Sequence, residues 1–354
     1  MFAITSGDDT IKYLEMHLIF LIPISLLHFL ATAQGFGKCS SPIVRREWRT
    51  LSSGEQQDYI EAVQCLMEKP PRSSIPAAIS RYDDFVGTHI VQADETHFVG
   101  VFYPFHRLLV SSFEQTLRRE CGYAGSQPYW DWTLDLDDLE GSPIFDPDTG
   151  FGGNGDWVDG TLDNPEWGVP VVAHQDFDDR TGGGCIPNGP FQGMVTSMGP
   201  NRNIERQRAR CVRRDFAPQT FRDRCNVEET MDQDSFVGFH RASESMAHAS
   251  GHYGIGGLYG AMTDKWASPA DPIFWLHHSN VDRLWWSWQM RDIENRLKDI
   301  SGPLVAHDWR NWNGGNISLE YRVKLSAIGD EAPLFDMMDI QGSYFCYEFD
   351  ELYE

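Results

Sequence analysis

The sequence predicts a mainly α fold in which a four-helix bundle core is surrounded by long loops and little sheet. Apolar side chains recur at three- and four-residue steps, the period of a helix with one buried face. No alternating apolar and polar run is long enough to predict a large sheet. Residues 121–179 contain no Lys or Arg and many Asp, Gly and Pro, which is typical of loops. Hydrophobic residues make up 41% of the chain, enough to bury a sizeable core.

The first predicted helix begins at Ser52 or Ser53. A serine followed by Glu55 is a capping signal, and the apolar residue Ile60 and its successors continue at helical spacing. Pro70 ends this helix, because proline lacks the N–H group that a helix interior requires.

Further helices are predicted where apolar residues and histidines share one face. The second predicted helix carries Tyr82, Val86 and His89. The third begins after Pro104 and carries His106, Leu109, Phe113 and Leu117. The last two contain His248 with His252, and the run from His278 to Trp288.

An apolar run near the N-terminus, followed by a small-x-small pattern, predicts a signal peptide over residues 1–33 and a single domain over 34–354. The alternative is an uncleaved anchor through residues 17–33, although the run is shorter than the roughly 20 apolar residues of a typical membrane span. Acidic residues before the second methionine leave the start open between Met1 and Met16. We therefore expect a protein of the secretory pathway lumen or the exterior, with membrane contact only through an uncleaved anchor.

The seven cysteines agree with secretion, because scattered cysteines without a CxxC pair form disulfides in oxidising compartments. An odd number leaves at least one cysteine without an internal partner, and the sequence does not give the pairing. A single glycosylation sequon begins at Asn316 and predicts a surface loop.

The net charge of −23 disfavours nucleic acids and polyanions as partners, since phosphate binding depends on clustered Lys and Arg. Residues 202–224 reverse this balance with eight arginines, which we interpret as a solvated or salt-bridged surface. An acidic shell suits an uncharged substrate or a peptide better than an anion.

The most informative feature is the distribution of the histidines. A pair at i and i+4 lies on one helix face and can hold one metal ion, and a third histidine from another helix completes the site. His248 and His252 are such a pair, and His278 on a following helix is the third member of their group. A second group of three, His89, His97 and His106, lies within 18 residues in the first half of the chain.

Sites made only of imidazoles suit copper or zinc rather than hard oxygen-seeking cations. A zinc protease of the HExxH type would need Glu after His248, where Ala249 stands. A di-iron bundle would need two Glu-x-x-His motifs, and the nearest match is Asp94 before His97. Copper is therefore favoured by elimination.

Longer motifs around these histidines resemble the tyrosinase family of type-3 copper proteins. They are HFVGVFYPFHR at 97–107, PYWDW at 128–132 and DPIFWLHHSNVDRLW at 271–285, and the resemblance extends over about residues 39–289. The segment VRREWRTLS at 44–52 is similar to short secreted fungal members, some of which belong to peptide natural-product clusters.

The resemblance implies a dicopper centre that uses dioxygen to oxidise phenols to quinones, with ortho-hydroxylation of monophenols. The implied partners are dioxygen and a phenolic small molecule or a tyrosine-containing peptide, in fungal secondary metabolism. Of the adjacent pair His277 and His278, the family ligand matches His278, and His277 is expected to point elsewhere. The implied copper ligands are His89, His97 and His106 for copper A, and His248, His252 and His278 for copper B.

The resemblance also implies a catalytic role for Glu244, where relatives often carry an acid that orders a water near the phenol. Two alternatives remain. Many tyrosinases carry Asn directly after the first copper B histidine, and Ala249 at this position favours a catechol oxidase without monophenol activity. A hemocyanin-like oxygen carrier would use the same centre in a much larger chain. Asp282, one turn after His278, is expected to support the site or to pack the helix.

Overall fold

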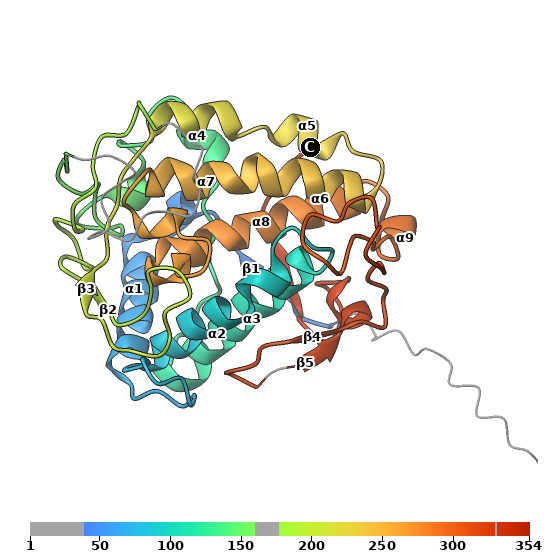
Figure 1. Ribbon diagram of the computed structural model, residues 1–354, viewed down its shortest axis with the longest axis horizontal. Coiled ribbons are helices and arrows are strands. Elements are labelled where there is room, and N and C mark those ends of the chain that lie inside the picture. The colour runs from blue at the N-terminus through green and yellow to red at the C-terminus, as the bar shows by residue number, and fades with distance from the viewer. Residues whose placement is uncertain (1–38, 160–176, 330) are drawn as a thin grey trace, which may run out of the picture. The chain divides into compact units, whose positions relative to one another are not determined.

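Four helices form the core, which confirms the predicted mainly α fold. The computed structural model describes residues 39–159, 177–329 and 331–354 (Figure 1). The two pairs of histidine-bearing helices lie in its interior and are buried along most of their length. They are α2 (Arg81–Thr96), α3 (Phe102–Cys121), α7 (Ala247–Gly256) and α8 (Ile273–Met290).

The helix boundaries follow local capping chemistry. Helix α1 (Ser53–Glu68) begins with a capping box between Ser52 and Glu55, as predicted. Helix α3 begins at Phe102, three residues earlier than predicted, so that Pro104 lies inside its first turn. Proline is tolerated there because the first N–H groups of a helix have no helical acceptor.

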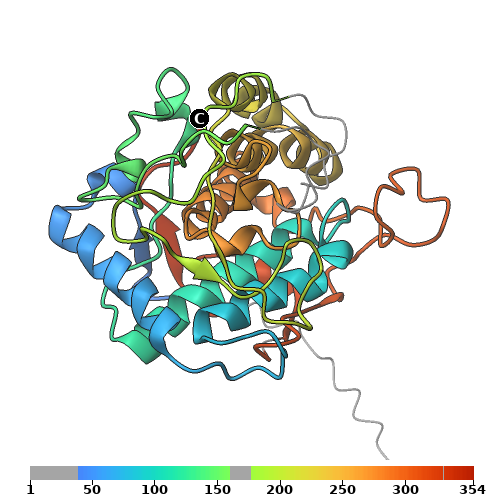
Figure 2. The same ribbon diagram turned by 60° about the vertical axis from the view of Figure 1, so that its left-hand side comes forward.

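Shorter helices and strands surround this core. Helix α7 packs against α4 (Pro218–Arg224) and α6 (Phe236–Ser245), and α5 (Val227–Met231) and α9 (Ile293–Arg296) lie near α8. Figure 2 shows the loop after α9 projecting from the helices, and Asn316 in this loop is exposed, as the sequon predicted.

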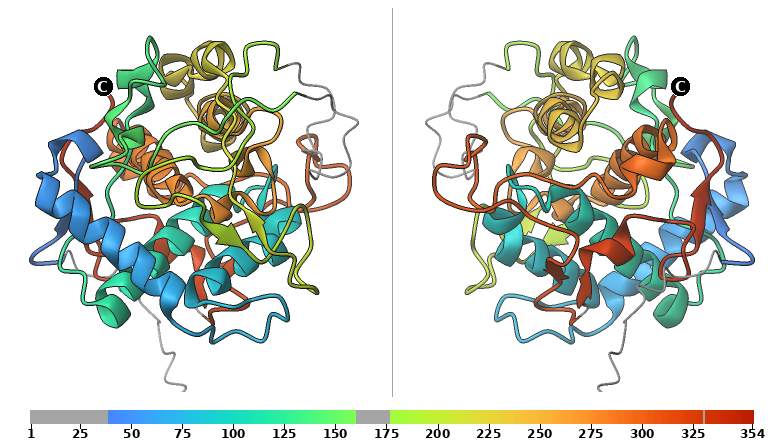
Figure 3. Two further views of the ribbon diagram at one scale, coloured as in Figure 1. Left: turned by 90° about the vertical axis from the view of Figure 1, so that its left-hand side faces the viewer. Right: turned by 90° about the vertical axis from the view of Figure 1, so that its right-hand side faces the viewer.

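Sheet in the described residues is limited to two-stranded pairs. Strands β1 (Ile43–Arg45) and β6 (Tyr347–Phe349) are parallel and join the two ends of the described chain (Figure 3). The two antiparallel pairs are β2 (Val195–Thr196) with β3 (Arg210–Cys211), and β4 (Arg322–Lys324) with β5 (Glu331–Pro333).

A buried ionic cluster ties β1 and β6 to the helices. Asp282 of α8 accepts hydrogen bonds from Arg107 of α3 at 2.5 Å, from Arg45 of β1 at 3.2 Å and from the Tyr347 hydroxyl. Arg45 also donates to Glu114 of α3 at 2.6 Å and lies 3.6 Å from the Tyr347 ring. All these side chains are buried, so Asp282 acts in helix and strand packing.

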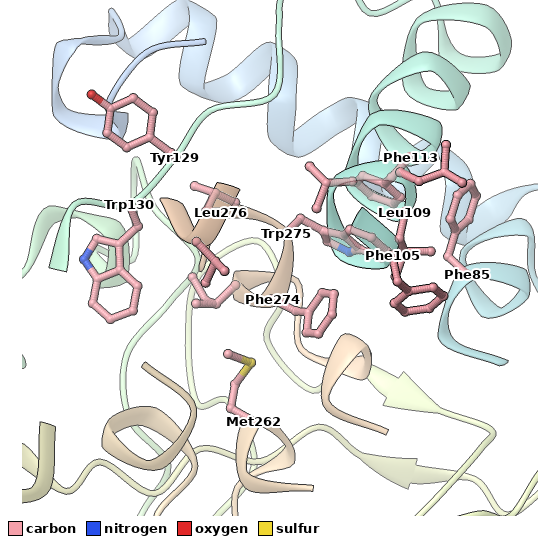
Figure 4. Packing of buried hydrophobic residues seen from close by; sticks show 14 of the residues in the cluster. Phe85, Phe105, Leu109, Phe113, Tyr129, Trp130, Met262, Phe274, Trp275 and Leu276 are labelled. Carbon is pink, nitrogen blue, oxygen red and sulfur yellow. The ribbon is translucent and has the colours of Figure 1, made fainter. Parts of the chain in front are cut away.

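Aromatic side chains join α8 to α2 and α3 (Figure 4). Trp275 is stacked on Phe113 with their ring centroids 3.8 Å apart, and Phe85 meets both rings edge-on. Phe274, the residue before Trp275, points toward the histidines and lies 5.2 Å from the His89 ring and 4.2 Å from the His278 ring. This packing sets the spacing between the helices that carry the two histidine groups.

Three disulfides form and Cys225 remains free, in agreement with the odd count of cysteines. The bonds are Cys39–Cys346, Cys65–Cys121 and Cys185–Cys211, and they are consistent with a secreted protein. In the part of the chain that the structure describes, no helix combines the length and apolarity needed to cross a bilayer. The signal peptide predicted over residues 1–33 lies outside the described residues, and its separation from one domain over 34–354 stays a prediction.

Candidate functional site

The first histidine group lies where α2 ends and α3 begins. His89 is in α2, His97 is the residue at which α2 ends, and His106 is one turn into α3. Their ring centroids are 5.0–5.6 Å apart, with His97 and His106 the nearest pair. Phe98, directly after His97, has φ of 59°, so the chain turns sharply and presents the His97 ring to the other two.

The second group is formed by α7 and α8. His248 and His252 lie one turn apart on α7 with ring centroids separated by 4.5 Å. His278 of α8 lies 5.2 Å from His248 and 5.3 Å from His252. In each group, one ligand atom from every histidine lies within 4.8 Å of the others, a spacing that could hold a metal ion.

The two groups face each other across the bundle. The rings of His106 and His278 are stacked with centroids 4.2 Å apart and planes 11° apart. The ring centroids of His97 and His248, which also belong to opposite groups, are 6.4 Å apart. The six predicted histidines are therefore brought together into one assembly, although about 140 residues separate the first group from the second.

Backbone carbonyls orient the histidine rings. A carbonyl can only accept a hydrogen bond, so each Nδ1 that contacts one carries the proton and leaves the Nε2 lone pair available. Five of the six rings are held in this way, with distances of 2.6–3.0 Å, and the pairs are His89 to Trp266, His97 to Ala93, His106 to Phe102, His248 to Glu244 and His252 to Met262.

The freed Nε2 atoms converge. The Nε2 atoms of His89 and His106 are 3.5 Å apart, and those of His252 and His278 are 3.2 Å apart. The Nε2 of His248 is buried and has no hydrogen-bond partner among the described residues. The five Nε2 atoms whose rings carry the proton on Nδ1 offer lone pairs to the space between the helices, and such an arrangement fits metal ions held by neutral imidazoles.

Burial keeps these histidines neutral. It lowers the pKa of His89 to about 3 and the pKa of His252 to about 4. Burial also lowers the pKa of the other four well below the ordinary histidine value. Neutral imidazole is the form that binds a transition metal, and an all-imidazole donor set suits copper.

A fourth histidine, His277, lies beside the second group. One of its ring nitrogens is within 4.8 Å of the ligand atoms of His248, His252 and His278, and neither ring nitrogen has a hydrogen-bond partner among the described residues. Its ring packs on Trp132 at 5.2 Å, whereas His278 is stacked on His106 of the first group. A metal ion between the two groups would therefore be closer to the His278 ring than to the His277 ring. His278 is the residue that the family resemblance implied.

A cavity of about 430 Å³ opens onto this assembly. His97, His248 and His252 form part of its lining. The other lining residues are Asp94, Phe98, Arg202, Glu244, Ala249, Tyr253, Met262, Thr263, Lys265, Trp266, Ser268 and His307. The cavity thus gives a substrate access to both histidine groups.

Glu244 is fixed in the cavity wall by two contacts. Its Oε1 accepts a hydrogen bond from the Phe98 N–H at 2.8 Å, and its Oε2 lies 2.8 Å from His240 Nε2. A carboxylate offers about four lone-pair directions, so it can accept a further bond from a ligand in the cavity. The structure therefore brings the predicted acidic residue to the site.

Sequence reasoning missed the pairing of Arg202 with Asp94 at the cavity mouth. Arg202 belongs to the arginine-rich run that we interpreted as surface, and it bonds Asp94 of α2 at 2.7 Å. The same run contains Arg214, which is fully buried and paired with Asp271 at 2.8 Å. Composition carries no signal for these partners, because they are brought together only by the tertiary fold.

Comparisons with known proteins agree with this geometry. Residues 79–291 match the family model described as the common central domain of tyrosinase. The chain is 36% identical to tyrosinase-like protein phomQ1 of Diaporthe leptostromiformis, over 92% of this chain and 82% of that protein. It is 34% identical to tyrosinase P of Aspergillus terreus, over 88% and 93%. A solved structure of a mutant polyphenol oxidase from Thermothelomyces thermophila has a TM-score of 0.75 and 31% identity, covering 88% of this chain and 89% of that one.

Proposed function

The chain belongs to the tyrosinase family of type-3 dicopper oxidases, and from this premise we propose that it oxidises phenols to quinones with dioxygen, beginning with ortho-hydroxylation when the substrate is a monophenol. The observation that carries the proposal is the pair of facing three-histidine groups beside the cavity. The fungal relatives are a tyrosinase and a tyrosinase-like protein by name, which supports a phenolic substrate. We propose a small phenol or a peptide tyrosine, in fungal secondary metabolism.

We assign copper A to His89, His97 and His106, and copper B to His248, His252 and His278. The converging Nε2 atoms and the anchored Nδ1 atoms support this assignment. When bound, the copper pair supplies dioxygen activation and accepts the electrons of the phenol. The protein holds the imidazoles neutral and in fixed orientations.

The cavity walls position the phenol and keep water away. Phe98, Met262 and Trp266 supply apolar surface against which an aromatic ring packs. Glu244 lies in the same wall, and we assign it the role of accepting the phenol proton, directly or through a water that it orders.

A catechol oxidase is the second candidate, and Ala249 supports it. This residue follows His248 and lines the cavity, but its methyl group cannot hydrogen-bond a water next to Glu244. Loss of that contact weakens deprotonation of a monophenol, whereas a catechol needs less help because its hydroxyls lose protons more readily.

We expect the copper-loaded protein to hydroxylate tyrosine or a tyrosine peptide and to oxidise a catechol. Replacement of Glu244 by Gln keeps its shape and should lower monophenol turnover by about 100-fold, the lower range for a positioned acid–base group. Catechol oxidation should fall much less. Oxygen uptake and quinone absorbance measure both reactions.

The control is Glu228→Gln, which removes an exposed carboxylate of α5 and should change neither rate. Catechol turnover without any tyrosine turnover would select the catechol oxidase. Reversible oxygen binding without turnover of either phenol would contradict the proposed oxidation and favour an oxygen carrier.

A further inference from the structure

The mouth of the copper cavity carries a cluster of three charged residues from distant parts of the chain. Asp94 of α2 accepts a hydrogen bond from Arg202 Nε at 2.7 Å and another from Lys265 Nζ at 3.1 Å. All three line the cavity. The side chains of Arg202 and Asp94 are 67% and 44% exposed, and that of Lys265 is 24% exposed. The cluster is thus open to solvent and to an entering ligand.

This cluster has an excess of positive charge in a strongly acidic protein. Two cations, Arg202 and Lys265, share one anion, Asp94. Hydrogen bonding from Arg202 lowers the pKa of Asp94 to about 2 and keeps it ionised. The other acidic lining residue, Glu244, is buried and is not paired with either cation, so it lies outside this exposed cluster. The remaining charge at the mouth is therefore positive, against −23 for the whole chain.

Of the two cations, Lys265 is better positioned than Arg202 to contact a substrate in the cavity. Its Nζ lies 5.2 Å from the centroid of the Trp266 ring and 5.9 Å from that of the Phe98 ring, and both rings line the cavity. The Arg202 guanidinium lies 4.5 Å from the Trp266 ring and is more exposed. An aromatic ring packed on Phe98 or Trp266 thus has a cation beside it.

We propose that Lys265, assisted by Arg202, binds a carboxylate carried by the phenolic substrate, and that Asp94 competes with this carboxylate for the two cations. This inference rests on the proposed function and deepens it, since it names phenols and catechols with an acidic side arm as the preferred class. The carboxylate can belong to a free phenolic acid or to an acidic residue beside a peptide tyrosine.

The cluster is a poor candidate for a purely structural role. Solvent-exposed ion pairs contribute little to folding, because water screens the charges and long side chains lose freedom when they pair. A carboxylate held partly out of water between two cations interacts more strongly, since charged donors make the stronger hydrogen bonds. The same cluster can therefore contribute more to substrate selection than to stability.

The test compares dihydrocaffeic acid with its primary amide, which differ at the carboxylate alone. We expect the acid to have the higher kcat/KM, and Lys265→Met to lower the acid-to-amide ratio by about tenfold, the effect of one charge-assisted hydrogen bond. Asp94→Asn should raise the ratio, because it frees both cations. Lys298→Met, which removes an exposed lysine after α9, should leave the ratio unchanged.

A binding measurement on the copper-loaded protein removes turnover from the test. Calorimetric titration with hydrocinnamic acid, which has no phenol hydroxyl, should give tighter binding than its amide, and Lys265→Met should abolish the difference. Tyrosine peptides that place Asp or Asn next to Tyr, with amidated ends, distinguish a peptide carboxylate from that of a free acid. High salt should reduce the preference for each acid.

Equal kcat/KM for acid and amide in the unmodified protein would overturn the carboxylate site and leave the proposed oxidase intact. A lower acid-to-amide ratio in Asp94→Asn would also overturn the carboxylate site. A purely structural cluster predicts that the ratio falls in both Lys265→Met and Asp94→Asn. Absence of turnover for both catechols would instead refute the proposed function.

Discussion

Replacing His278 with alanine is expected to remove one copper ion from each chain and to abolish phenol oxidation. His278 is fully buried, its Nε2 lies 3.2 Å from that of His252, and its ring is stacked on His106 of the other group. Loss of a residue that only supports a ligand lowers metal affinity by about 10–100-fold, and loss of the ligand itself should exceed that range. Elemental analysis of copper per chain measures the result directly.

The adjacent residue provides the matched control. His277 is equally buried and lies on the same helix, but its ring packs on Trp132 rather than on the first histidine group. His277→Ala should therefore keep both copper ions, and far-UV circular dichroism should show that both variants are folded. Loss of copper in His277→Ala together with full copper content in His278→Ala would contradict the ligand assignment.

Replacing Asp282 with alanine is expected to lower the free energy of unfolding by about 3–5 kcal/mol, the cost of removing one partner from a buried ion pair. Asp282 accepts hydrogen bonds from Arg45, Arg107 and Tyr347, so its loss leaves two buried guanidinium groups with fewer acceptors. Because Arg45 lies in β1 and Tyr347 in β6, the substitution should also loosen the pairing of these strands. Urea unfolding followed by tryptophan fluorescence measures the change.

Asp137→Ala is the control for this substitution. The Asp137 side chain is fully exposed and lies 3.6 Å from Arg222, so its removal should cost less than about 1 kcal/mol. Both variants should be compared with copper bound, since a metal that binds only the folded state adds to its stability. Similar small changes for the two substitutions would show that the buried cluster contributes little.

The sequence was sufficient to predict α1 and the four histidine-bearing helices, because these depend on local periodicity, whereas the grouping of the histidines into threes also used the resemblance to a known family. The box formed by Ser52 and Glu55 marks the start of α1, and His248 and His252 lie one turn apart on α7. Each of these signals lies within a few residues, so no tertiary information was needed. The assignment of six specific ligands remains a prediction that the copper analysis tests.

Contacts between distant segments could not be predicted in this way. Arg202 and Arg214 come from the same arginine-rich run, yet one is exposed at the cavity mouth and the other is fully buried against Asp271. The expectation of an uncharged substrate rested on total charge, whereas the charge at the mouth depends on which side chains meet there. Local sequence contains neither the burial of each arginine nor the charge at the cavity mouth, because both are properties of the folded chain.

The carbonyl groups that orient the histidines also connect the two metal positions. The segment between α7 and α8 supplies the acceptor for His89 of the first group, through Trp266, and for His252 of the second, through Met262. Lys265, at the cavity mouth, lies in the same segment. The orientation of one imidazole in each group therefore depends on the position of this single segment, which also carries a charged residue of the cavity lining.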